Sequence, residues 1–377
     1  DSRRGGTSFG AFATATHRAI DDAALEFLPT SAYVAGVDGR HRFGGGNYEV
    51  SGWLMGSQVA GDSSALRLLQ LSPAHYFQRP DADHLDYDPT VTSMDGLDAR
   101  LKVTKVGGGH WRAEVLGRVR TPGFEINDLG FQRTADWVQQ SAYVGYEQYK
   151  PGKVFRSWNV YANQFGGWST GGERINSGFN LNAGYQFHNL WNGYVAVTSL
   201  LSRLYVDALR GGPALQAPQS FNLSAGLNTD PRKRLVLNMG GGFEVDDAGT
   251  AGGSIGGALS YRPSARAQLS VSPNLTLLNG VAQYIGQTTA AGARRYLFGS
   301  IEQRTLSLTT RLNYTFTPNL SLQFYAQPYV SAGDFSEFKQ VADPKAWAFD
   351  SRFHVLTGDE ISYDTGRRRY SVDLTGD

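Results

Sequence analysis

The chain of 377 residues carries 35 basic and 34 acidic side chains, and its net charge of +1 gives no support to a nucleic-acid partner. Charged residues make up 18% of the chain, below the about 25% of a typical soluble domain, while aromatic residues reach 12%. Cysteine is absent, which excludes disulfides and thiolate metal sites, and no run of about 20 apolar residues predicts a membrane-spanning helix.

The chain begins with Asp1 to Arg4, which lack the apolar stretch of a secretion signal. A strand is expected close to this start, over residues 7–16. We therefore expect that the N-terminus is processed or that the chain is part of a longer protein.

From Phe9 to Val330 the sequence alternates between strands and turns, and the strands are about ten residues long. In residues 305–316, Leu306, Leu308 and Leu312 share one face, while Thr and Arg residues alternate with them. This period of two is typical of strands with two different faces. The strand tally is about sixteen, with the region 272–302 ambiguous.

The connections alternate between short turns and long loops. Residues 44–47, 107–110 and 317–319 are typical of tight turns, since they carry Gly, Pro and Asn. The long connections are 19–30, 61–95, 121–134, 168–175 and 204–218. Short periplasmic turns and long external loops would produce this alternation.

Together these features predict an all-β chain, a transmembrane antiparallel up-and-down β-barrel with about 16 or more strands. A soluble β-sandwich would also show period two, but charged side chains in mid-strand favour a wet barrel interior. The residues expected to line that interior are Arg112, Glu114, Arg118, Arg311 and Gln323. The aromatic residues expected to form the girdles at the membrane interfaces are Trp111, Trp137, Tyr185, Phe187, Trp191, Tyr194, Tyr261, Tyr314 and Phe316.

The pattern predicts a barrel over residues 1–333 and a charged extracellular loop or tail over 334–377. Only residues 369–374 of the tail look strand-like, and the chain ends on Asp377, whereas bacterial barrels usually end on an aromatic residue. We expect the closing strands to lie beyond this end.

Three strings are more specific. They are Tyr-Phe-Gln-Arg-Pro-Asp-Ala-Asp-His at 76–84, Gly-Phe-Glu-Ile-Asn-Asp-Leu-Gly-Phe at 123–131 and Leu-Ser-Leu-Gln-Phe-Tyr-Ala-Gln-Pro at 320–328. They resemble the barrel half of a bacterial outer-membrane family whose N-terminal half looks like a carbohydrate-binding family 9 module. That barrel half is a domain of unknown function. The resemblance implies a place in the bacterial outer membrane and a preceding binding module, and it supplies no catalytic residues.

A weak calcium candidate lies in the second long loop, because hard cations bind several carboxylate oxygens. Its four acids are Asp81, Asp83, Asp86 and Asp88. A solvated loop is the alternative, since an EF-hand glycine and a terminal Glu are lacking. His75 and His84 flank the stretch without zinc-ligand spacing.

Glu125, Asp128 and Asp136 resemble the paired carboxylates of a glycosidase, but a structured loop is favoured. Arg112, Arg118 and Arg120, opposite Glu114, could select solutes or form cross-strand ion pairs. No phosphate loop, catalytic elbow or cofactor motif is found, so no cofactor is expected.

The leading functional hypothesis is an outer-membrane barrel that acts as a pore, a transport conduit or an anchor for a carbohydrate-binding module, without catalytic activity. Its partners would be outer-membrane lipids, and a partner protein or glycan bound through the loops. Two alternatives stay open: an assembly component of an outer-membrane complex, and an outer-membrane hydrolase. Ser177 and His188 are the nearest residues for the hydrolase.

Overall fold

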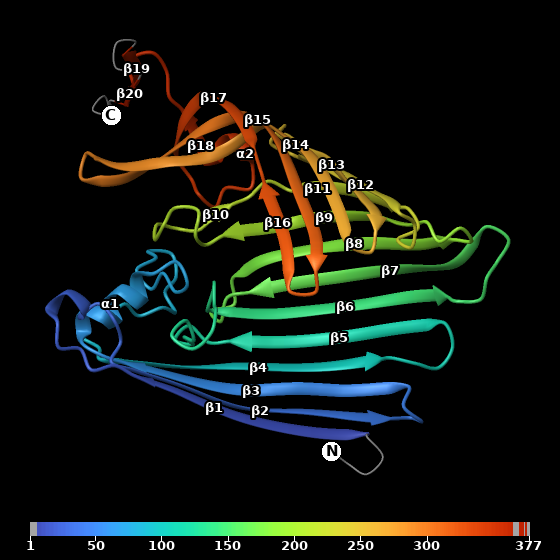
Figure 1. The fold of residues 1–377 in the computed structure, drawn as a ribbon. Helices are drawn as coiled ribbons and strands as arrows, with labels where there is room; N and C mark the ends of the chain where they lie inside the picture. Colours follow the sequence, from blue (N-terminus) through green and yellow to red (C-terminus); the bar gives the residue numbers. More distant parts are fainter. Residues whose placement is uncertain (1–5, 365–368, 373, 375–377) are drawn as a thin grey trace. The chain divides into compact units, whose positions relative to one another are not determined.

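The computed structural model describes residues 6–364, 369–372 and 374, and strands make up most of these residues (Figure 1). Within this described part of the chain, eighteen strands form one antiparallel sheet. They are β1 (Thr7–His17), β2 (Ser31–Phe43), β3 (Tyr48–Ala60), β4 (Ser93–Lys105), β5 (Trp111–Arg120), β6 (Trp137–Gln148), β7 (Phe155–Trp168), β8 (Arg174–Phe187), β9 (Asn192–Tyr205), β10 (Leu215–Gln216), β11 (Ser220–Asn228), β12 (Leu235–Asp246), β13 (Ala251–Ser264), β14 (Ala267–Ala290), β15 (Ala293–Thr317), β16 (Leu320–Ala326), β17 (Tyr329–Val341) and β18 (Phe353–Val355). The other elements are α1 (Ser63–Leu71), α2 (Phe349–Arg352), a 3-10 turn (Ala23–Leu25) and the hairpin of β19 (Ile361–Asp364) and β20 (Arg369–Val372).

The sheet follows the order of the chain. Each strand pairs with the next, except that β11 also pairs with β9 past the two-residue β10, and β17 pairs with β15 past β16. This topology confirms the predicted all-β, antiparallel up-and-down fold, and the 18 strands found among the described residues agree with the prediction of about 16 or more.

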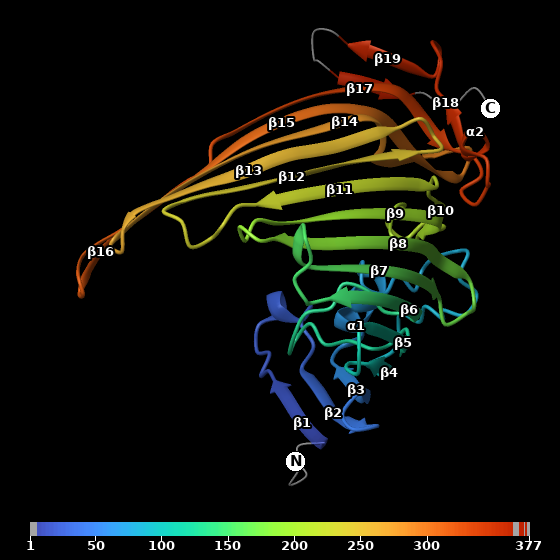
Figure 2. The same cartoon turned by 90° about the vertical axis from the view of Figure 1, so that its right-hand side faces the viewer.

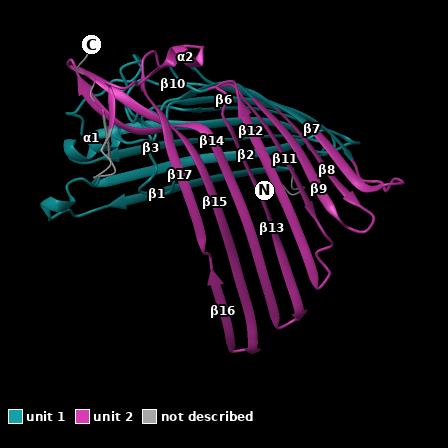
Figure 3. Cartoon of the chain, turned by 90° about the horizontal axis from the view of Figure 1, so that it is seen from above, with its two compact units in different colours: residues 1–147, 161–179, 200–217 teal, residues 148–160, 180–199, 218–377 magenta. Residues whose placement is uncertain are grey.

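The chain divides into two compact units, coloured separately in Figure 3. Unit 1 comprises residues 1–147, 161–179 and 200–217, and unit 2 comprises 148–160, 180–199 and 218–377. Each unit is described by itself below.

The strands of unit 1 have two unlike faces. The register places Val37 opposite Leu54 on one face, and Trp53 opposite Arg100, itself opposite Arg118, on the other. We call these the apolar and polar faces of unit 1. The exposed apolar face carries Phe9, Val37, Leu54, Leu97, Leu101, Val103, Val115 and Val119.

At the end of unit 1 where the long loops lie, the polar face itself becomes apolar and is covered. Val59 pairs with Met94 on this face, and both are buried. Helix α1 lays Ala65 and Leu66 on Met94, and both helix residues are fully buried. The helix stops at Leu71 because the next residue, Ser72, precedes Pro73 and is extended. The loop after β3 is therefore packed on the sheet instead of standing free in solvent.

Unit 2 repeats the two-faced pattern, and Figure 2 shows its strands β12, β13, β14 and β15 side by side. Polar residues such as Asn238, Ser254 and Asn274 share one face, which we call the polar face of unit 2. Its apolar face carries Leu235, Met239, Phe243, Val245, Ile255, Leu259, Leu269 and Leu306, all exposed.

The ambiguous region 272–302 lies within the two longest strands, β14 with 24 residues and β15 with 25. Beyond the ladder shared with β13, this hairpin carries a small core with β17 and β18. Phe298 stacks edge-on against Phe353 at 5.4 Å, and Ile301 and Val341 are buried with them. The predicted barrel boundary at residue 333 falls inside β17, which continues to Val341. Part of the predicted tail, 365–368, 373 and 375–377, lies outside the described residues.

In the described part of the chain, no helix has both the length and the apolar character needed to cross a membrane.

Candidate functional site

The candidate site has two parts, both in unit 1: a cluster of loops and a patch of charged side chains on the polar face. We call the first the loop cluster. It consists of loops 61–92 and 121–136, the β7–β8 turn 169–173 and the segment 206–217. Side chains from these segments bind one another through the contacts described next.

A buried ion pair joins the two longest loops of the cluster. His75 Nε2 lies 2.7 Å from Glu125 Oε2, and the two side chains are 0% and 1% exposed. His75 Nδ1 lies 2.8 Å from the carbonyl of Pro122, which can only accept a hydrogen bond. Nδ1 therefore donates to this carbonyl, and Nε2 faces the Glu125 carboxylate.

Glu125 is ionised despite its burial. Burial alone raises the pKa of its carboxyl, but hydrogen bonds from His75 and from the N–H of Asn127 outweigh that effect and hold the pKa below its usual value. The N–H of Glu125 itself donates to Ser57 Oγ on β3 at 3.0 Å. The pair therefore fastens loop 61–92 to loop 121–136, and loop 121–136 to the sheet.

Loop 121–136 rests directly on the polar face at Gly96. An added Cβ at Gly96 would lie 2.1 Å from the backbone nitrogen of Phe124, so only glycine allows this approach. Phe124 is fully buried, with the Arg120 guanidinium 5.2 Å from its ring centroid. Both long loops thus fold inward over the polar face.

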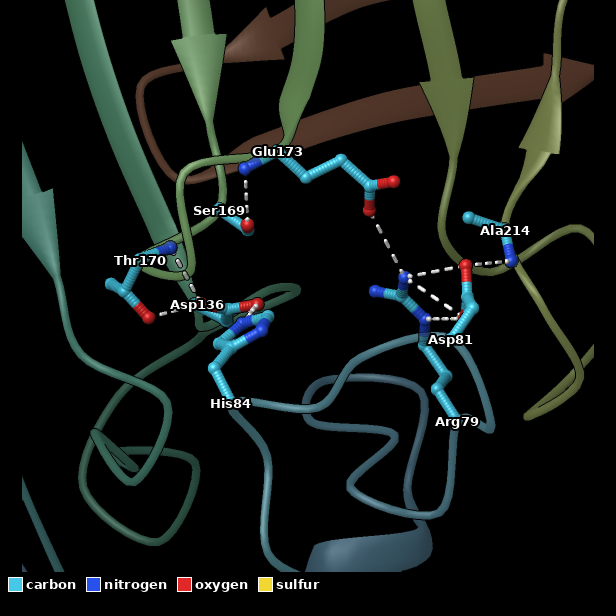
Figure 4. A network of polar contacts seen from close by, with 8 residues as sticks. All are labelled: Arg79, Asp81, His84, Asp136, Ser169, Thr170, Glu173 and Ala214. Carbon is cyan, nitrogen blue, oxygen red and sulfur yellow. Dashed lines mark hydrogen bonds and ion pairs between the residues drawn. The ribbon is translucent and has the colours of Figure 1, made fainter. Parts of the chain in front are cut away.

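A second set of contacts ties loop 61–92 to the β7–β8 turn and to segment 206–217 (Figure 4). Arg79, only 3% exposed, binds Asp81 at 3.3 Å and lies 3.7 Å from Glu173. Asp81 also accepts the N–H of Ala214 at 3.0 Å. The Glu173 N–H donates to Ser169 Oγ, which closes the turn.

Beside it, His84 and Asp136 link loop 61–92 to the end of loop 121–136 (Figure 4). His84 Nε2 lies 2.8 Å from Asp136 Oδ2, and the other Asp136 oxygen accepts both the N–H and the hydroxyl of Thr170. Asp136 has a φ of +53°, a left-handed conformation that aspartate tolerates better than most residues. These contacts hold the segments of the loop cluster together.

The second part of the site lies in mid-strand on the polar face. Asp98 on β4 is 0% exposed and accepts hydrogen bonds from Trp53 Nε1 at 2.7 Å, from Arg118 at 2.7 Å and from Arg120 at 2.7 Å. Arg100, the next residue of β4 on this face, stacks its guanidinium 3.6 Å above the Trp53 ring. We call these five residues the arginine patch.

Elsewhere on the polar face of unit 1, opposite charges are paired. Lys102 lies 3.2 Å from Glu114, and Arg112 lies 3.0 Å from Glu147. Arg112 and Glu114 thus lie on the face where the sequence predicted a charged lining, each with an ion-pair partner.

The family model of the domain of unknown function DUF5916 matches residues 78–355. The chain belongs to the DUF5916 family. No curated protein matches its sequence. The resemblance to a barrel half of unknown function is thereby supported, and the association with a carbohydrate-binding family 9-like module stays a prediction.

This DUF5916 chain is also similar to solved structures. The siderophore receptor PirA from Acinetobacter baumannii has 8% identity and a TM-score of 0.44, over 88% of this chain and 59% of that chain. A ferric enterobactin receptor variant (PfeA) from Pseudomonas aeruginosa has 9% identity and a TM-score of 0.43, over 89% and 59%. An anion-selective porin from Comamonas acidovorans has 13% identity and a TM-score of 0.32, over 73% and 91%. The DUF5916 chain spans 59% of the length of each of the two receptors.

The predicted calcium candidate does not form in this DUF5916 chain. Asp81 is bound to Arg79, and Asp88 accepts the hydroxyl and N–H of Thr90, which hold the pKa of Asp88 below its usual value. Asp83 and Asp86 are exposed. Among the described residues, no three acidic or histidine side chains come close enough together to hold a metal ion.

The carboxylates weighed for a glycosidase are likewise bound to basic side chains. Glu125 binds His75, Asp136 binds His84, and Asp128 lies 2.5 Å from Arg18. For the hydrolase hypothesis, the candidate His188 is bound to the backbone, since its Nε2 donates to the carbonyl of Gly152 in the β6–β7 turn at 2.9 Å. Each of these groups has a structural partner.

Most of the predicted girdle residues lie on the apolar faces or in turns. Trp111, Tyr261 and Tyr314 are exposed on apolar faces, and Trp191 lies in the β8–β9 turn. Phe316 stacks on Tyr314 at 4.6 Å. Tyr185 and Phe187 stack on each other and on Phe155.

Two girdle residues differ from the expectation. Trp137 pairs with Arg120 on the polar face of unit 1, 5.4 Å from the Arg118 guanidinium. The Tyr194 ring covers Gly226 on the polar face of unit 2, where an added Cβ would lie 2.5 Å from the ring. Arg311 and Gln323, predicted to line the interior, do lie on that polar face.

The sequence pattern also failed to single out Asp98 and Arg100 as site residues. The signal was present: Asp98, Arg100 and Lys102 alternate on one strand, and Arg118 and Arg120 alternate two residues apart on the next. What was missing was the register, which brings one buried acid between two arginines.

Proposed function

We propose that this chain is the barrel of a bacterial outer-membrane protein, that the polar face of unit 1 lies along an aqueous path, and that the loop cluster closes that path at one end. The observation that carries the proposal is the packing of loops 61–92 and 121–136 onto the polar face of β3 and β4. The chain would then be a closed conduit that has to rearrange before it conducts.

The apolar faces support the membrane part of the proposal. Ile255 is 68% exposed, Leu101 61% and Val115 59%, and they belong to continuous apolar surfaces. In water, apolar patches of this extent are unusual on a monomer. In a bilayer they face lipid chains, and the backbone groups of the paired strands are already hydrogen-bonded. Outer-membrane lipids are therefore the proposed partners of these faces.

The ion pairs support the aqueous part. Charged side chains in mid-strand, such as Lys102 with Glu114, belong on a face in contact with water and not with lipid. Within the loop cluster, buried partners such as His75 and Glu125 join segments far apart in the sequence. In the cluster, His75 binds Glu125 and His84 binds Asp136, so these four groups already hold segments of the chain together.

Planar-bilayer recordings of the natural full-length protein test the proposal. A variant whose residues 64–90 are replaced by a short Gly-Ser linker is compared with a control in which residues 20–27 are replaced in the same way. We expect the first to conduct in discrete steps, and the wild type and the control to stay closed.

Heat-modifiable mobility on gels shows whether each variant is folded. A folded 64–90 variant that does not conduct, or a wild-type protein that conducts equally well, contradicts the closed-conduit proposal. Recovery of the protein from the inner membrane or the soluble fraction contradicts the outer-membrane part.

Exposed aromatic side chains on two loops favour a second candidate, in which the loops bind a partner protein or a glycan. Phe131 is 79% exposed and Phe27 is 52% exposed. Pull-down from native membranes with wild-type protein and with a variant carrying Phe131→Ser and Phe27→Ser tests it. Equal recovery of co-purifying proteins and glycans by both forms contradicts it.

A further inference from the structure

A row of side chains crosses the polar face of unit 1 at one level. Strand pairing aligns Asp38 with Trp53, Trp53 with Arg100, and Arg100 with Arg118. Two arginines thus stand directly opposite each other on neighbouring strands. Like charges in this position repel each other and destabilise the sheet unless an anion lies between them.

The acids that could compensate these charges are already engaged. Asp98 is shared by Arg118 and Arg120, whose side chains leave it no exposed surface. Glu114 lies 3.2 Å from Lys102. Asp38 lies on the far side of Trp53 in the same row, and its carboxylate covers Gly10, where an added Cβ would lie 2.4 Å from it.

Arg100 consequently has no ion-pair partner of its own in the described part of the chain, although Glu114 and Asp98 act on it electrostatically. Within the described residues it forms no ion pair within 4.0 Å and no hydrogen bond, and its buried Nε has no hydrogen-bond partner. The group is not loose, because its guanidinium stacks 3.6 Å from the centre of the Trp53 ring. A cation held flat on an aromatic ring with its donors unused is a preorganised anion receptor.

The shape of the group indicates the class of anion. A guanidinium presents a planar fork of N–H donors that matches two oxygens of a carboxylate or a phosphate, whereas chloride offers a single point. Arg118, beside it, donates from its Nε and one terminal nitrogen to Asp98, and its charge adds positive potential next to Arg100. The patch of Arg100, Arg118 and Arg120 carries three positive charges against the single charge of Asp98.

We propose that Arg100, stacked on Trp53 and flanked by Arg118, binds a small oxyanion solute, a carboxylate or a phosphate. A role of this site in selecting the solutes that pass along the polar face rests on the proposed function. Oxyanion binding does not rest on that function, because binding can be measured on the protein in detergent.

Calorimetric titration of the natural full-length protein with succinate, with inorganic phosphate and with chloride, at matched ionic strength, tests the proposal. We expect saturable binding of succinate or phosphate, and at least tenfold weaker binding of chloride. Tryptophan fluorescence should change in the same titration, and Trp53→Phe should remove that change.

The matched variants are Arg100→Gln and, as a control on the same face, Arg42→Gln. Arg42 is paired with Glu49 at 2.9 Å and lies outside the patch. Arg100→Gln should weaken oxyanion binding at least tenfold, while Arg42→Gln should change it less than twofold. Arg100→Lys, which keeps the charge but loses the fork, should weaken binding several-fold and guards against a folding defect in the glutamine variant.

Equal affinity of the Arg100→Gln and wild-type proteins for the oxyanions overturns the proposal, and so does chloride binding as tight as that of phosphate. The same variants in planar bilayers separate the two proposals. Oxyanion binding that depends on Arg100 in a protein without any conductance sinks the conduit and leaves this site standing. Conductance in a protein that shows no oxyanion binding dependent on Arg100 overturns the oxyanion site and leaves the conduit proposal standing.

Discussion

Replacing Glu125 with glutamine removes one charge from the buried pair that joins the two longest loops. The His75 side chain, which is 0% exposed, then faces a neutral amide in place of the carboxylate. Removing one partner of a buried ion pair costs about 3–5 kcal/mol. The lower figure corresponds to an opening equilibrium of the loop about a hundredfold larger.

Hydrogen–deuterium exchange in detergent measures this opening. At neutral pH, peptides covering residues 121–132 should exchange about a hundredfold faster in Glu125→Gln than in the wild type. Asp86→Asn, an exposed carboxylate in the partner loop, is the control and should leave the exchange unchanged. Peptides from strand β14 should be equally protected in both variants.

The same pair predicts a pH dependence in the wild type. The pKa of Glu125 is lower in the folded loop than its ordinary value of 4.5, so the carboxylate stabilises the closed loop above that value. This stabilisation is lost as the pH falls below 4.5 and through the lower folded pKa, so protection factors of residues 121–132 should fall there. Unchanged exchange in Glu125→Gln at neutral pH, or protection that does not fall in acid, refutes the reasoning.

Three further predictions concern packing and the two faces. Gly96→Ala places a Cβ 2.1 Å from Phe124 N, so loop 121–136 must shift at a cost of about 1–3 kcal/mol. Limited proteolysis should then cleave that loop faster than in the wild type, and an unchanged cleavage rate contradicts the prediction. Asp98→Asn, which leaves two arginines short of their shared carboxylate, should lower the stability of the folded barrel to urea by about 3–5 kcal/mol, and a midpoint equal to that of the wild type argues against the buried pair. Ile255→Arg on the apolar face should lower the free energy of unfolding in lipid vesicles by about 2–4 kcal/mol, whereas Ser254→Arg on the polar face should leave it unchanged. Equal effects of the two substitutions exclude a lipid-facing surface.

The alternation of apolar and polar residues was enough to predict strands and their two faces, because side-chain direction along a strand reverses at every residue and depends only on local geometry. Leu306, Leu308 and Leu312 were placed on one face in this way, and the turn and loop signals between strands predicted the up-and-down order. The region 272–302 resisted the same reasoning. Register shifts between Leu278 and Val281 and between Tyr284 and Gly286 interrupt the period there.

Contacts between distant residues were decided by the tertiary structure. Trp137 lies on the polar face because its strand pairs it with Arg120, and the residue count of a loop does not reveal that register. Loop 61–92, which has the composition of an exposed connection, folds onto the sheet because Met94 and Val59 offer it an apolar surface. His75 and Glu125 are 50 residues apart, and Asp98 is 20 residues from Arg118. The energy of such pairs comes from burial and mutual distance, which exist only once the chain is folded.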